Sequence, residues 1–336
     1  MVADLNKCMG CHTCTVACKT LRTNDRGMDH MWWAKVNTLP GRGYPKDWED
    51  MGGGYDAGGQ LVLGKRPEAD DYGGIGELPY QDVFFGGRGS DAHLAPATKP
   101  TWGPNWEEDI GGGAYPNAYY FYMPRICNHC SRPACAESCP RSAIHKDADG
   151  LVAIDEATCE GCADPLCMQA CPYKEIYYNP VRQVAQKCDG CLSRLADGVA
   201  PACVRQCPGR MLWIDYLDNA EGPVHKLVNE WKVALPLHHE YGTMPNVYYV
   251  PPLAPPALDE NGEPDPSRPR IPPEELRRLF GPEVDQALAT LQQERERQRD
   301  GGSELMNLLI ARHWQELLGP WAKDPSEVQN HGHSDN

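Results

Sequence analysis

The strongest constraint on this chain is the arrangement of its 16 cysteines, which fall into four groups of four with none left over. The first group has the spacing C-x2-C-x2-C-x3-C, the second and third share C-x2-C-x4-C-x3-C, and the last is C-x2-C-x11-C-x3-C. Quartets one to four are, in order, Cys8, Cys11, Cys14 and Cys18; Cys127, Cys130, Cys135 and Cys139; Cys159, Cys162, Cys167 and Cys171; and Cys188, Cys191, Cys203 and Cys207. Any fold of this chain must gather thiols in sets.

The spacing is typical of iron–sulfur ligation. Two-residue gaps let one tight loop turn three thiolates toward a cluster, while the fourth cysteine points along the chain to a second cluster. Proline follows the last cysteine of three quartets and disfavours helix there, whereas Lys19 takes that place in quartet one. We therefore expect quartets to work in pairs, each lending its last cysteine to its partner. His12 and His129 lie inside these loops, either as groups that tune a cluster or as ordinary loop residues.

Three other uses of cysteine compete with iron. Disulfides require an oxidising compartment, but the N-terminal residues lack the basic and apolar regions of a secretory signal. Structural zinc uses paired C-x2-C units and needs neither the fourth cysteine nor the proline. Catalytic cysteines occur singly rather than in fours. The repeated spacing favours all sixteen cysteines as iron ligands.

The composition indicates that bound clusters hold the chain together as much as a hydrophobic core does. Hydrophobic residues are 41% of the 336, and 33 glycines with 31 prolines indicate much irregular backbone. The formal net charge of −15 argues against a nucleic-acid surface and favours protein partners. No stretch approaches the roughly 20 apolar residues of a membrane helix, so we expect no direct membrane insertion.

Repeated loop, short helix and strand predict an α+β fold with two bacterial-ferredoxin-like modules, each holding two clusters. Strand pairs are expected at 143–154 and 176–187, and a further strand at 211–216. Residues 1–32 with 172–245 would form one module, and 116–171 the other.

Two further segments complete the predicted organisation. Residues 33–115 are a glycine- and tryptophan-rich insertion, which we interpret as a partner-docking loop, with a mobile loop as the alternative. Its glycine runs and the tryptophans in or beside it are Gly52–Gly54, Gly58–Gly59, Gly86–Gly87, Gly111–Gly113, Trp32, Trp33, Trp48, Trp102 and Trp106. Residues 246–336 are a proline-rich extended arm followed by helices over 274–299 and 304–318, separated by Gly301 and Gly302.

Three runs of sequence resemble one known family: Asp4 to Cys14, Gly43 to Glu49, and Cys171 to Lys174. They resemble the iron–sulfur β subunits of the complex iron–sulfur molybdoenzymes (the DMSO reductase type II family). These include nitrate, selenate, chlorate and perchlorate reductases and dimethylsulfide and ethylbenzene dehydrogenases. The resemblance covers residues 1 to about 250 and is less sharp in the C-terminal arm.

The resemblance implies four clusters and assigns their ligands. The implied sets are Cys8, Cys11, Cys14 and Cys207; Cys188, Cys191, Cys203 and Cys18; Cys127, Cys130, Cys135 and Cys171; and Cys159, Cys162, Cys167 and Cys139. Several family members have a non-cysteine residue at the position of Cys162 (tryptophan in nitrate reductase) and hold a three-iron cluster there. Because the cysteine is present here, we expect four 4Fe–4S clusters, with three 4Fe–4S and one 3Fe–4S as the alternative.

The resemblance also implies a function and partners. The chain would relay single electrons between the molybdenum bis(pyranopterin guanine dinucleotide) centre of a catalytic α subunit and a haem b subunit, either a soluble γ subunit or a membrane anchor. It would bind no organic substrate itself. The missing signal and the absence of a large C-terminal extension favour a periplasmic complex, exported on a twin-arginine signal of the α subunit. A cytoplasmic complex attached to the membrane through a partner is the alternative.

Two other classes of function stay open. One is a free multi-cluster ferredoxin that serves several enzymes, although the insertion and the arm offer more docking surface than a diffusing carrier needs. The other is an enzyme with an open iron, such as a radical or hydratase protein, although four complete quartets leave no open iron.

The intact Cys162 site generates a spectroscopic prediction. Because each cluster has four cysteines available, the oxidised protein should lack the near-isotropic low-temperature EPR signal of a three-iron centre. Observation of that signal would show that iron is not retained beside Cys162.

Overall fold

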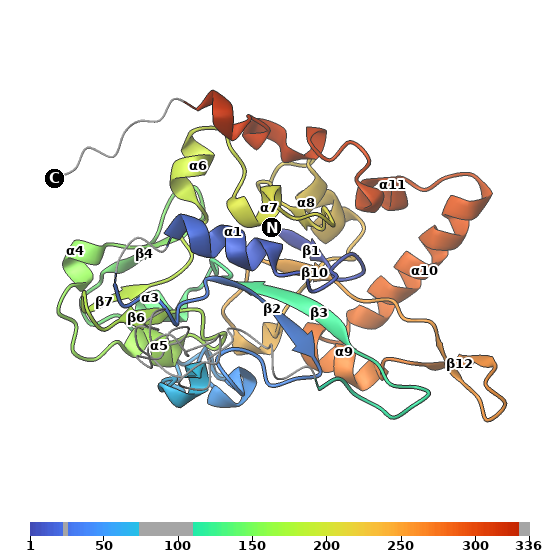
Figure 1. Cartoon of the computed structure of the whole chain (residues 1–336), viewed down its shortest axis with the longest axis horizontal. Helices are drawn as coiled ribbons and strands as arrows, with labels where there is room; N and C mark the ends of the chain where they lie inside the picture. The colour runs from blue at the N-terminus through green and yellow to red at the C-terminus, as the bar shows by residue number, and fades with distance from the viewer. Residues whose placement is uncertain (23–25, 74–109, 329–336) are drawn as a thin grey trace, which may run out of the picture.

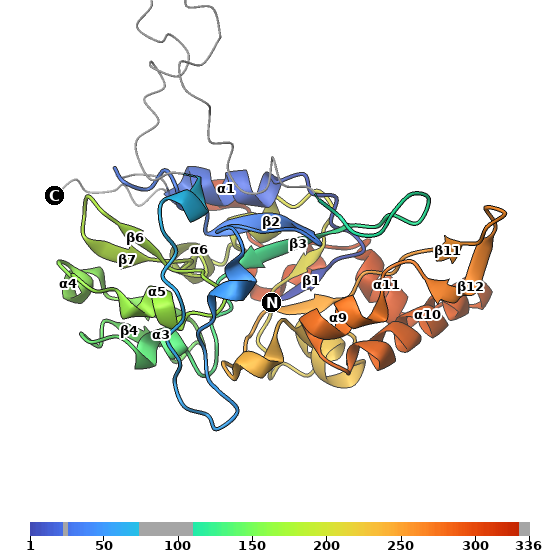
Figure 2. The same ribbon diagram turned by 90° about the horizontal axis from the view of Figure 1, so that it is seen from below.

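The computed structural model describes residues 1–22, 26–73 and 110–328. Figure 1 shows the short helices and hairpins of residues 134–186 on one side, the strands around the N-terminus in the middle, and the C-terminal helices on the other side. Figure 2 shows the same order from below, with strands β2 and β3 between the two sides. The predictions for residues 74–109, including Gly86–Gly87, Trp102 and Trp106, lie outside the described residues.

A central four-stranded sheet joins segments from distant parts of the chain. Its order is β8 (Leu212–Trp213), β1 (Val2–Asp4), β10 (Tyr248–Val250) and β9 (Leu235–Pro236). Strand β1 pairs parallel to β10 and antiparallel to β8. The predicted strand within 211–216 is confirmed as β8. Beside this sheet, β2 (Ala34–Leu39) pairs antiparallel with β3 (Phe121–Ile126), so the two ends of the insertion are held together.

The cysteines lie on or beside short helices that pack in two pairs. Helix α1 (Thr13–Arg22) packs against α7 (Ala202–Arg205), and α3 (Ala134–Glu137) packs against α5 (Leu166–Ala170). The other elements here are α4 (Glu156–Cys159), α6 (Leu192–Ala196), α8 (Pro223–His225) with a π-helical turn at Lys226–Glu230, and the hairpins β4 (Ile144–Lys146) with β5 (Val152–Ile154) and β6 (Tyr177–Asn179) with β7 (Val184–Gln186). The two predicted strand pairs are thereby confirmed.

The structure explains why quartet one lacks the proline of the other quartets. Cys18 lies inside α1, where a proline at the next position would remove a helical hydrogen bond. Lys19 continues the helix instead, and its ammonium donates hydrogen bonds to the carbonyls of Met28, Asp29 and Met31. Burial lowers the pKa of Lys19 to about 8. This lysine therefore fastens the segment after α1 to the helix that carries Cys14 and Cys18.

The insertion supplies core rather than only surface. Trp33, Trp48, Tyr44 and Tyr72 are each at most 5% exposed and belong to the main hydrophobic cluster. The Arg125 guanidinium lies 3.5 Å from the centre of the Trp48 ring. These tryptophans pack within the chain itself, and the interpretation of the insertion as a partner-docking loop stays a prediction.

The C-terminal helices differ from the prediction in two places. The helix expected over 274–299 is two helices, α9 (Pro273–Phe280) and α10 (Val284–Asp300), because Gly281 has φ = +80° and Pro282 follows it. The helix expected over 304–318 is α11 (Glu304–Ile310) followed by a 3-10 segment at Glu316–Trp321, because Ala311 has φ = +53° and ends the α-helix. The Ser303 hydroxyl caps α11 by accepting from the Met306 amide and donates to Glu294 on α10.

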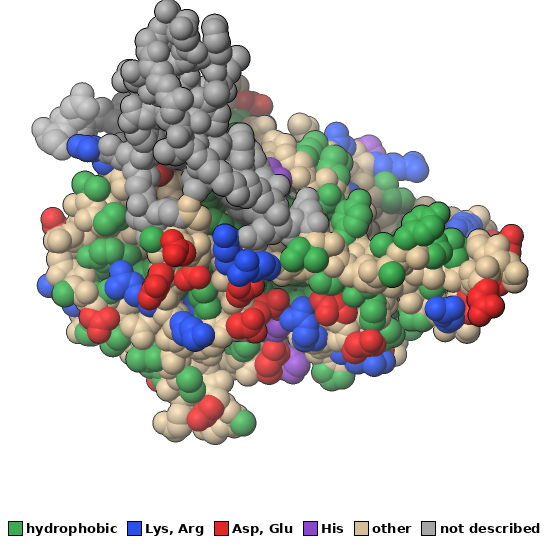
Figure 3. Space-filling view, turned by 60° about the horizontal axis from the view of Figure 1, so that its bottom comes forward, with side chains coloured by type: hydrophobic (Ala, Val, Ile, Leu, Met, Phe, Trp, Pro, Cys, Tyr) green, Lys and Arg blue, Asp and Glu red, His purple; other side chains and the backbone are tan. Residues whose placement is uncertain are grey.

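The proline-rich arm is only partly extended. It forms a hairpin of β11 (Pro256–Leu258) and β12 (Pro264–Pro269), visible as a protrusion in Figure 1. None of the described helices is both long and apolar enough to cross a membrane. On the face shown in Figure 3, acidic and basic side chains are interspersed, so the described residues there form no continuous basic stripe.

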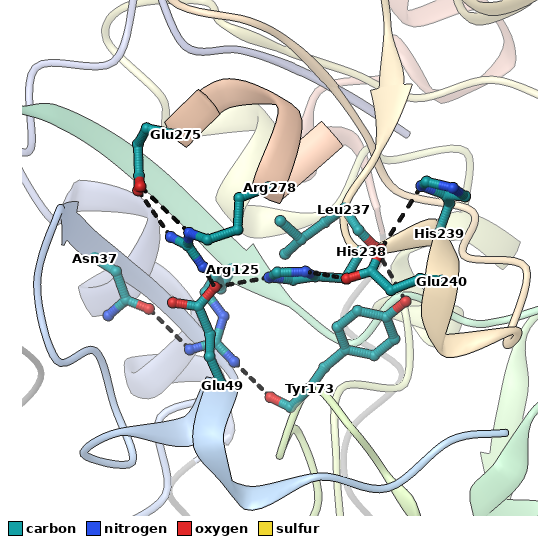
Figure 4. Close-up of polar contacts among 10 residues, drawn as sticks. All are labelled: Asn37, Glu49, Arg125, Tyr173, Leu237, His238, His239, Glu240, Glu275 and Arg278. Carbon is teal, nitrogen blue, oxygen red and sulfur yellow. Dashed lines mark hydrogen bonds and ion pairs between the residues drawn. The ribbon is translucent and has the colours of Figure 1, made fainter. Parts of the chain in front are cut away.

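A buried histidine ties the insertion to α9 (Figure 4). His238 has an exposed side-chain fraction of 4% and lies between two carboxylates, with Nε2 2.7 Å from Glu49 and Nδ1 2.7 Å from Glu240. Arg278 of α9 donates to Glu49 at 2.6 Å and also binds Glu275. Burial alone would lower the pKa of His238, but the hydrogen bonds to Glu240 and Glu49 outweigh burial and raise it above 6.5. The imidazolium is therefore the form that this network stabilises.

The network predicts a pH-dependent stability. Because the pKa of His238 is raised in the folded state, its contribution is fully present below about pH 6.5 and is lost as pH rises through the folded pKa. Substitution His238→Gln should cost about 2 kcal/mol at low pH, since two charge-assisted hydrogen bonds are weakened. Urea unfolding of both proteins at about pH 6 and about pH 9 tests this. An equal difference in unfolding free energy at both pH values would contradict it.

Candidate metal centres

All sixteen cysteines are described, and all are free thiols, so none forms a disulfide. Cys18, Cys127, Cys159, Cys162, Cys167 and Cys203 are buried, and only Cys11 is exposed. Several of the buried thiols sit in the hydrophobic clusters of the fold. The candidate sites thus occupy positions that apolar side chains would otherwise fill.

Quartet one lies beside the last cysteine of quartet four. Burial, with smaller contributions from the nearby Cys14, Cys207 and Cys11, raises the pKa of the Cys8 thiol to about 12. Burial also raises the pKa of Cys14 to about 11, with Cys207 as the next contribution. Cys207 therefore stands near Cys8 and Cys14 although quartet four is far away in sequence.

Quartet four in turn lies beside the last cysteine of quartet one. Burial raises the pKa of Cys18 to about 12, and Cys191 is the strongest neighbouring thiol. The pKa of Cys203 is raised well above 9 by burial and then by Cys191, Cys188 and Cys18. The packing of α1 against α7 produces this exchange, since the two helices carry Cys18 and Cys203.

Quartets two and three show the same exchange. The pKa of Cys135 is raised well above 9 by burial and then by Cys171, Cys127 and Cys130. The pKa of Cys167 is raised by burial and then by Cys139, Cys159 and Cys162. Each of these two quartets therefore has the other's last cysteine among its near neighbours.

Other interactions link one set of thiols to the next. Cys14 contributes to the raised pKa of Cys18 and of Cys203, which connects the first set with the second. Cys127 contributes to the raised pKa of Cys188, and Cys171 contributes to the raised pKa of Cys167. The four sets thus follow one another in a single order through the molecule.

Backbone and cationic groups surround the thiols. The Ala185 amide donates to Cys159 Sγ at 3.3 Å, and the Gly190 amide donates to Cys188 Sγ at 3.4 Å. Arg22 forms an ion pair with Asp189 beside Cys18 and Cys188. Lys174 is fully buried near Cys171, and burial lowers its pKa to about 8.

These residues fit iron–sulfur clusters. Buried, crowded thiols resist ionisation, so four thiolates can coexist in one site only if a cationic group neutralises them. Peptide N–H groups directed at ligand sulfur are one of the means by which proteins tune cluster potentials. A cavity of about 860 Å³ is lined by Cys18, Cys188, Cys191 and Cys203, so the second set faces open volume rather than packed side chains.

Several groups around the sites had not been predicted from sequence. Arg22 reaches Asp189, and Lys187 donates to the carbonyls of Val152 and Cys188. The contacts of Arg22 with Asp189 and of Lys187 with Val152 join residues that are far apart in the chain, so no local pattern marks them. Of these charged groups, Lys174 alone could have been singled out from the sequence, since it ends one of the runs that carry the family resemblance.

Comparison with known proteins places this chain among β subunits of reductases and dehydrogenases. Residues 118–216 match the family described as "4Fe-4S dicluster domain". The chain is 51% identical to the selenate reductase β subunit of Thauera selenatis, over 92% of this chain and 94% of the relative. It is 49% identical to the dimethylsulfide dehydrogenase β subunit of Rhodovulum sulfidophilum (95% and 97%) and 51% identical to the chlorate reductase β subunit of Ideonella dechloratans (92% and 94%).

The loop of quartet one generates a prediction at Gly10. This residue has φ = +67°, and a Cβ atom there would lie 2.6 Å from the Tyr122 ring. Gly10→Ala should therefore cost more than the roughly 1 kcal/mol of left-handed backbone alone and should lower the iron content of the purified protein. Gly150→Ala is the matched control, since Gly150 has φ = +85° but nothing within 4 Å of the added Cβ. Equal iron loss in both variants would contradict the steric argument.

Proposed function

Because this chain belongs to the β-subunit family of the DMSO reductase type II enzymes, and is therefore an iron–sulfur electron-transfer subunit, we propose that it relays single electrons through four clusters. The relay would connect a molybdenum-containing catalytic α subunit with a haem b subunit or another acceptor. Bound clusters would supply one-electron redox centres with potentials set by burial, charge and hydrogen bonds to sulfur.

The proposed ligand sets follow the exchanged neighbours. Cys207 completes the set of Cys8, Cys11 and Cys14, and Cys18 completes that of Cys188, Cys191 and Cys203. Cys171 completes the set of Cys127, Cys130 and Cys135, and Cys139 completes that of Cys159, Cys162 and Cys167. The observation that carries the proposal is that the last cysteine of each quartet interacts with the thiols of its partner quartet.

The proposed fold is two bacterial-ferredoxin-like modules. The packing of α1 against α7 supports one module from residues 1–32 and 172–245, and the packing of α3 against α5 supports another within 116–171. Residues 33–115 and 246–336 would add docking surface for the partner subunits. Every site would hold a 4Fe–4S cluster, because Cys162 is present and buried.

The order of the four sets supports a relay across the molecule. The set that Cys207 completes interacts with the set that Cys18 completes. Cys127 connects the latter set with the set that Cys171 completes, and Cys171 itself interacts with Cys167 of the fourth set. Such an order keeps each electron-transfer step short. The complex would lie in the periplasm, exported together with the α subunit.

Alanine substitutions test the exchanged ligands. Cys207→Ala should abolish the same EPR signal as Cys14→Ala, while Cys18→Ala should abolish the same signal as Cys203→Ala, because each pair shares a cluster. The spectra are recorded on dithionite-reduced protein purified with its partners. If Cys18→Ala and Cys14→Ala removed the same signal and Cys207→Ala another, the exchange would be wrong.

Purification tests the proposed assembly. The native protein should copurify with a molybdenum- and pterin-containing subunit in a constant ratio, and the substrate of that subunit should exchange electrons with the reduced chain. Recovery of this chain alone, stable and fully loaded with iron, would instead favour a free carrier.

A further inference from the structure

Three cationic side chains and one carboxylate are buried beside the last cysteine of quartet three. They are Lys35, Arg125, Lys174 and Glu175, each at most 2% exposed. Lys35 of β2 and Arg125 of β3 are directly opposite each other in the strand register, although like charges at opposed positions destabilise a strand pair. Charged side chains are seldom fully buried unless a group of opposite charge lies close by. This group of charges therefore calls for an anion.

Glu175 supplies only part of that negative charge. Its carboxylate lies 2.5 Å from Lys35 Nζ and 3.2 Å from the Arg125 guanidinium. Lys174 donates instead to two backbone carbonyls of α5, at 3.4 and 3.0 Å, and it forms no ion pair with a carboxylate in the described part of the chain. One carboxylate thus serves three buried cations, and two positive charges are left without a carboxylate partner among the described residues.

The remaining anionic group beside these cations is the Cys171 sulfur. The Glu175 amide donates a hydrogen bond to Cys171 Sγ, and the Lys174 amide donates to the Cys171 carbonyl at 3.2 Å. Arg125 donates at 2.5 Å to the carbonyl of Tyr173, which follows Cys171 by two residues. Burial lowers the pKa of each of the two lysines to about 8, and the Cys171 thiolate opposes this shift in both cases. Both lysines are therefore cationic at pH 7 and lie within electrostatic reach of this sulfur.

We propose that Lys35, Arg125 and Lys174 provide the counter-charge of the cluster that Cys171 completes, and that they raise the reduction potential of this cluster. The inference rests on the proposed function, since it requires a cluster on these thiols. Reduction adds a negative charge to a site that already holds four thiolates. Buried cations stabilise the reduced form more than the oxidised form, because their field acts through a medium of low dielectric constant.

The placement of these charges affects one step of the proposed relay. The cluster that Cys171 completes stands between the set that Cys18 completes and the set that Cys139 completes. Lys35 belongs to the insertion, whereas the cysteines of this cluster all lie outside the insertion. The insertion therefore contributes to the potential of a cluster that it does not ligate.

Redox titration of the intact complex at pH 7, followed by EPR, measures the effect. The signal of this cluster is the one that Cys135→Ala removes. Lys35→Met should lower the equilibrium constant for its reduction by roughly tenfold, about 59 mV for a one-electron couple, because one cation is removed. Glu175→Gln should shift the potential in the opposite direction, since it removes the opposing anion and keeps the backbone amide at Cys171. The double variant should return to near the wild-type value.

The opposite signs separate an effect of charge from an effect of packing. Damage to packing would shift both single variants in the same direction, and the double variant would be shifted further. Lys232→Met is the matched control, because Lys232 is exposed and its charge is screened by solvent, so all four potentials should stay unchanged. Shifts of the same sign in Lys35→Met and Glu175→Gln would overturn the inference. An unchanged potential in Lys35→Met, or equal shifts of all four clusters, would also overturn it.

A second variant covers the case in which Lys35→Met fails to assemble. Lys174→Gln removes a cation that has no carboxylate partner, so no buried carboxylate is left unpaired, and the amide nitrogen keeps a donor for the carbonyls of α5. It should lower the potential of the same cluster at low and at high salt, because buried charges are screened little. An unchanged potential in this variant overturns the inference alone. A wild-type complex without the cluster signal that Cys135→Ala removes overturns the proposed function as well.

Discussion

The structure depends on the crowding of buried thiols within its hydrophobic clusters. Burial raises the pKa of Cys8, Cys14 and Cys18 to about 11 or 12, so these sulfurs do not ionise together unless something positive lies between them. Iron meets that requirement, and iron–thiolate bonds would then join segments from opposite ends of the chain. A set containing Cys8 and Cys207, for example, links the N-terminal loop to the segment before β8. Little regular structure is needed where such links exist.

The protein environment of these sites is organised in layers. Peptide amides such as those of Ala185 and Gly190 point at sulfur, while Lys174 and the Arg22–Asp189 pair bring charge close to the ligands. Further out, the Lys35 ammonium and the Arg125 guanidinium pair with buried Glu175, and Arg125 also packs on Trp48. The insertion that supplies Trp48 therefore helps to fix the framework around the quartet-three segment.

Sequence reasoning was most successful where the pattern is local. The cysteine spacing, the hairpins β4–β5 and β6–β7 and the strand β8 all follow from contiguous residues, and the structure has these strands. It failed where a single residue decides a boundary: apolar periodicity runs across Gly281 and Ala311, but their positive φ angles end helices there. It could not find contacts between distant segments. His238 with Glu49, Arg22 with Asp189, and Val152 with His129 depend on tertiary packing that no spacing rule encodes.

The central claim is that these sulfurs are thiolates that hold iron in interleaved sets of four. The most direct measurement is the iron and acid-labile sulfide content of the purified protein, combined with Mössbauer spectroscopy to identify cluster type. The account predicts about four irons and about four sulfides for each quartet, all in cubane clusters. Far less iron, with zinc or disulfide bonds on the same cysteines, would contradict it.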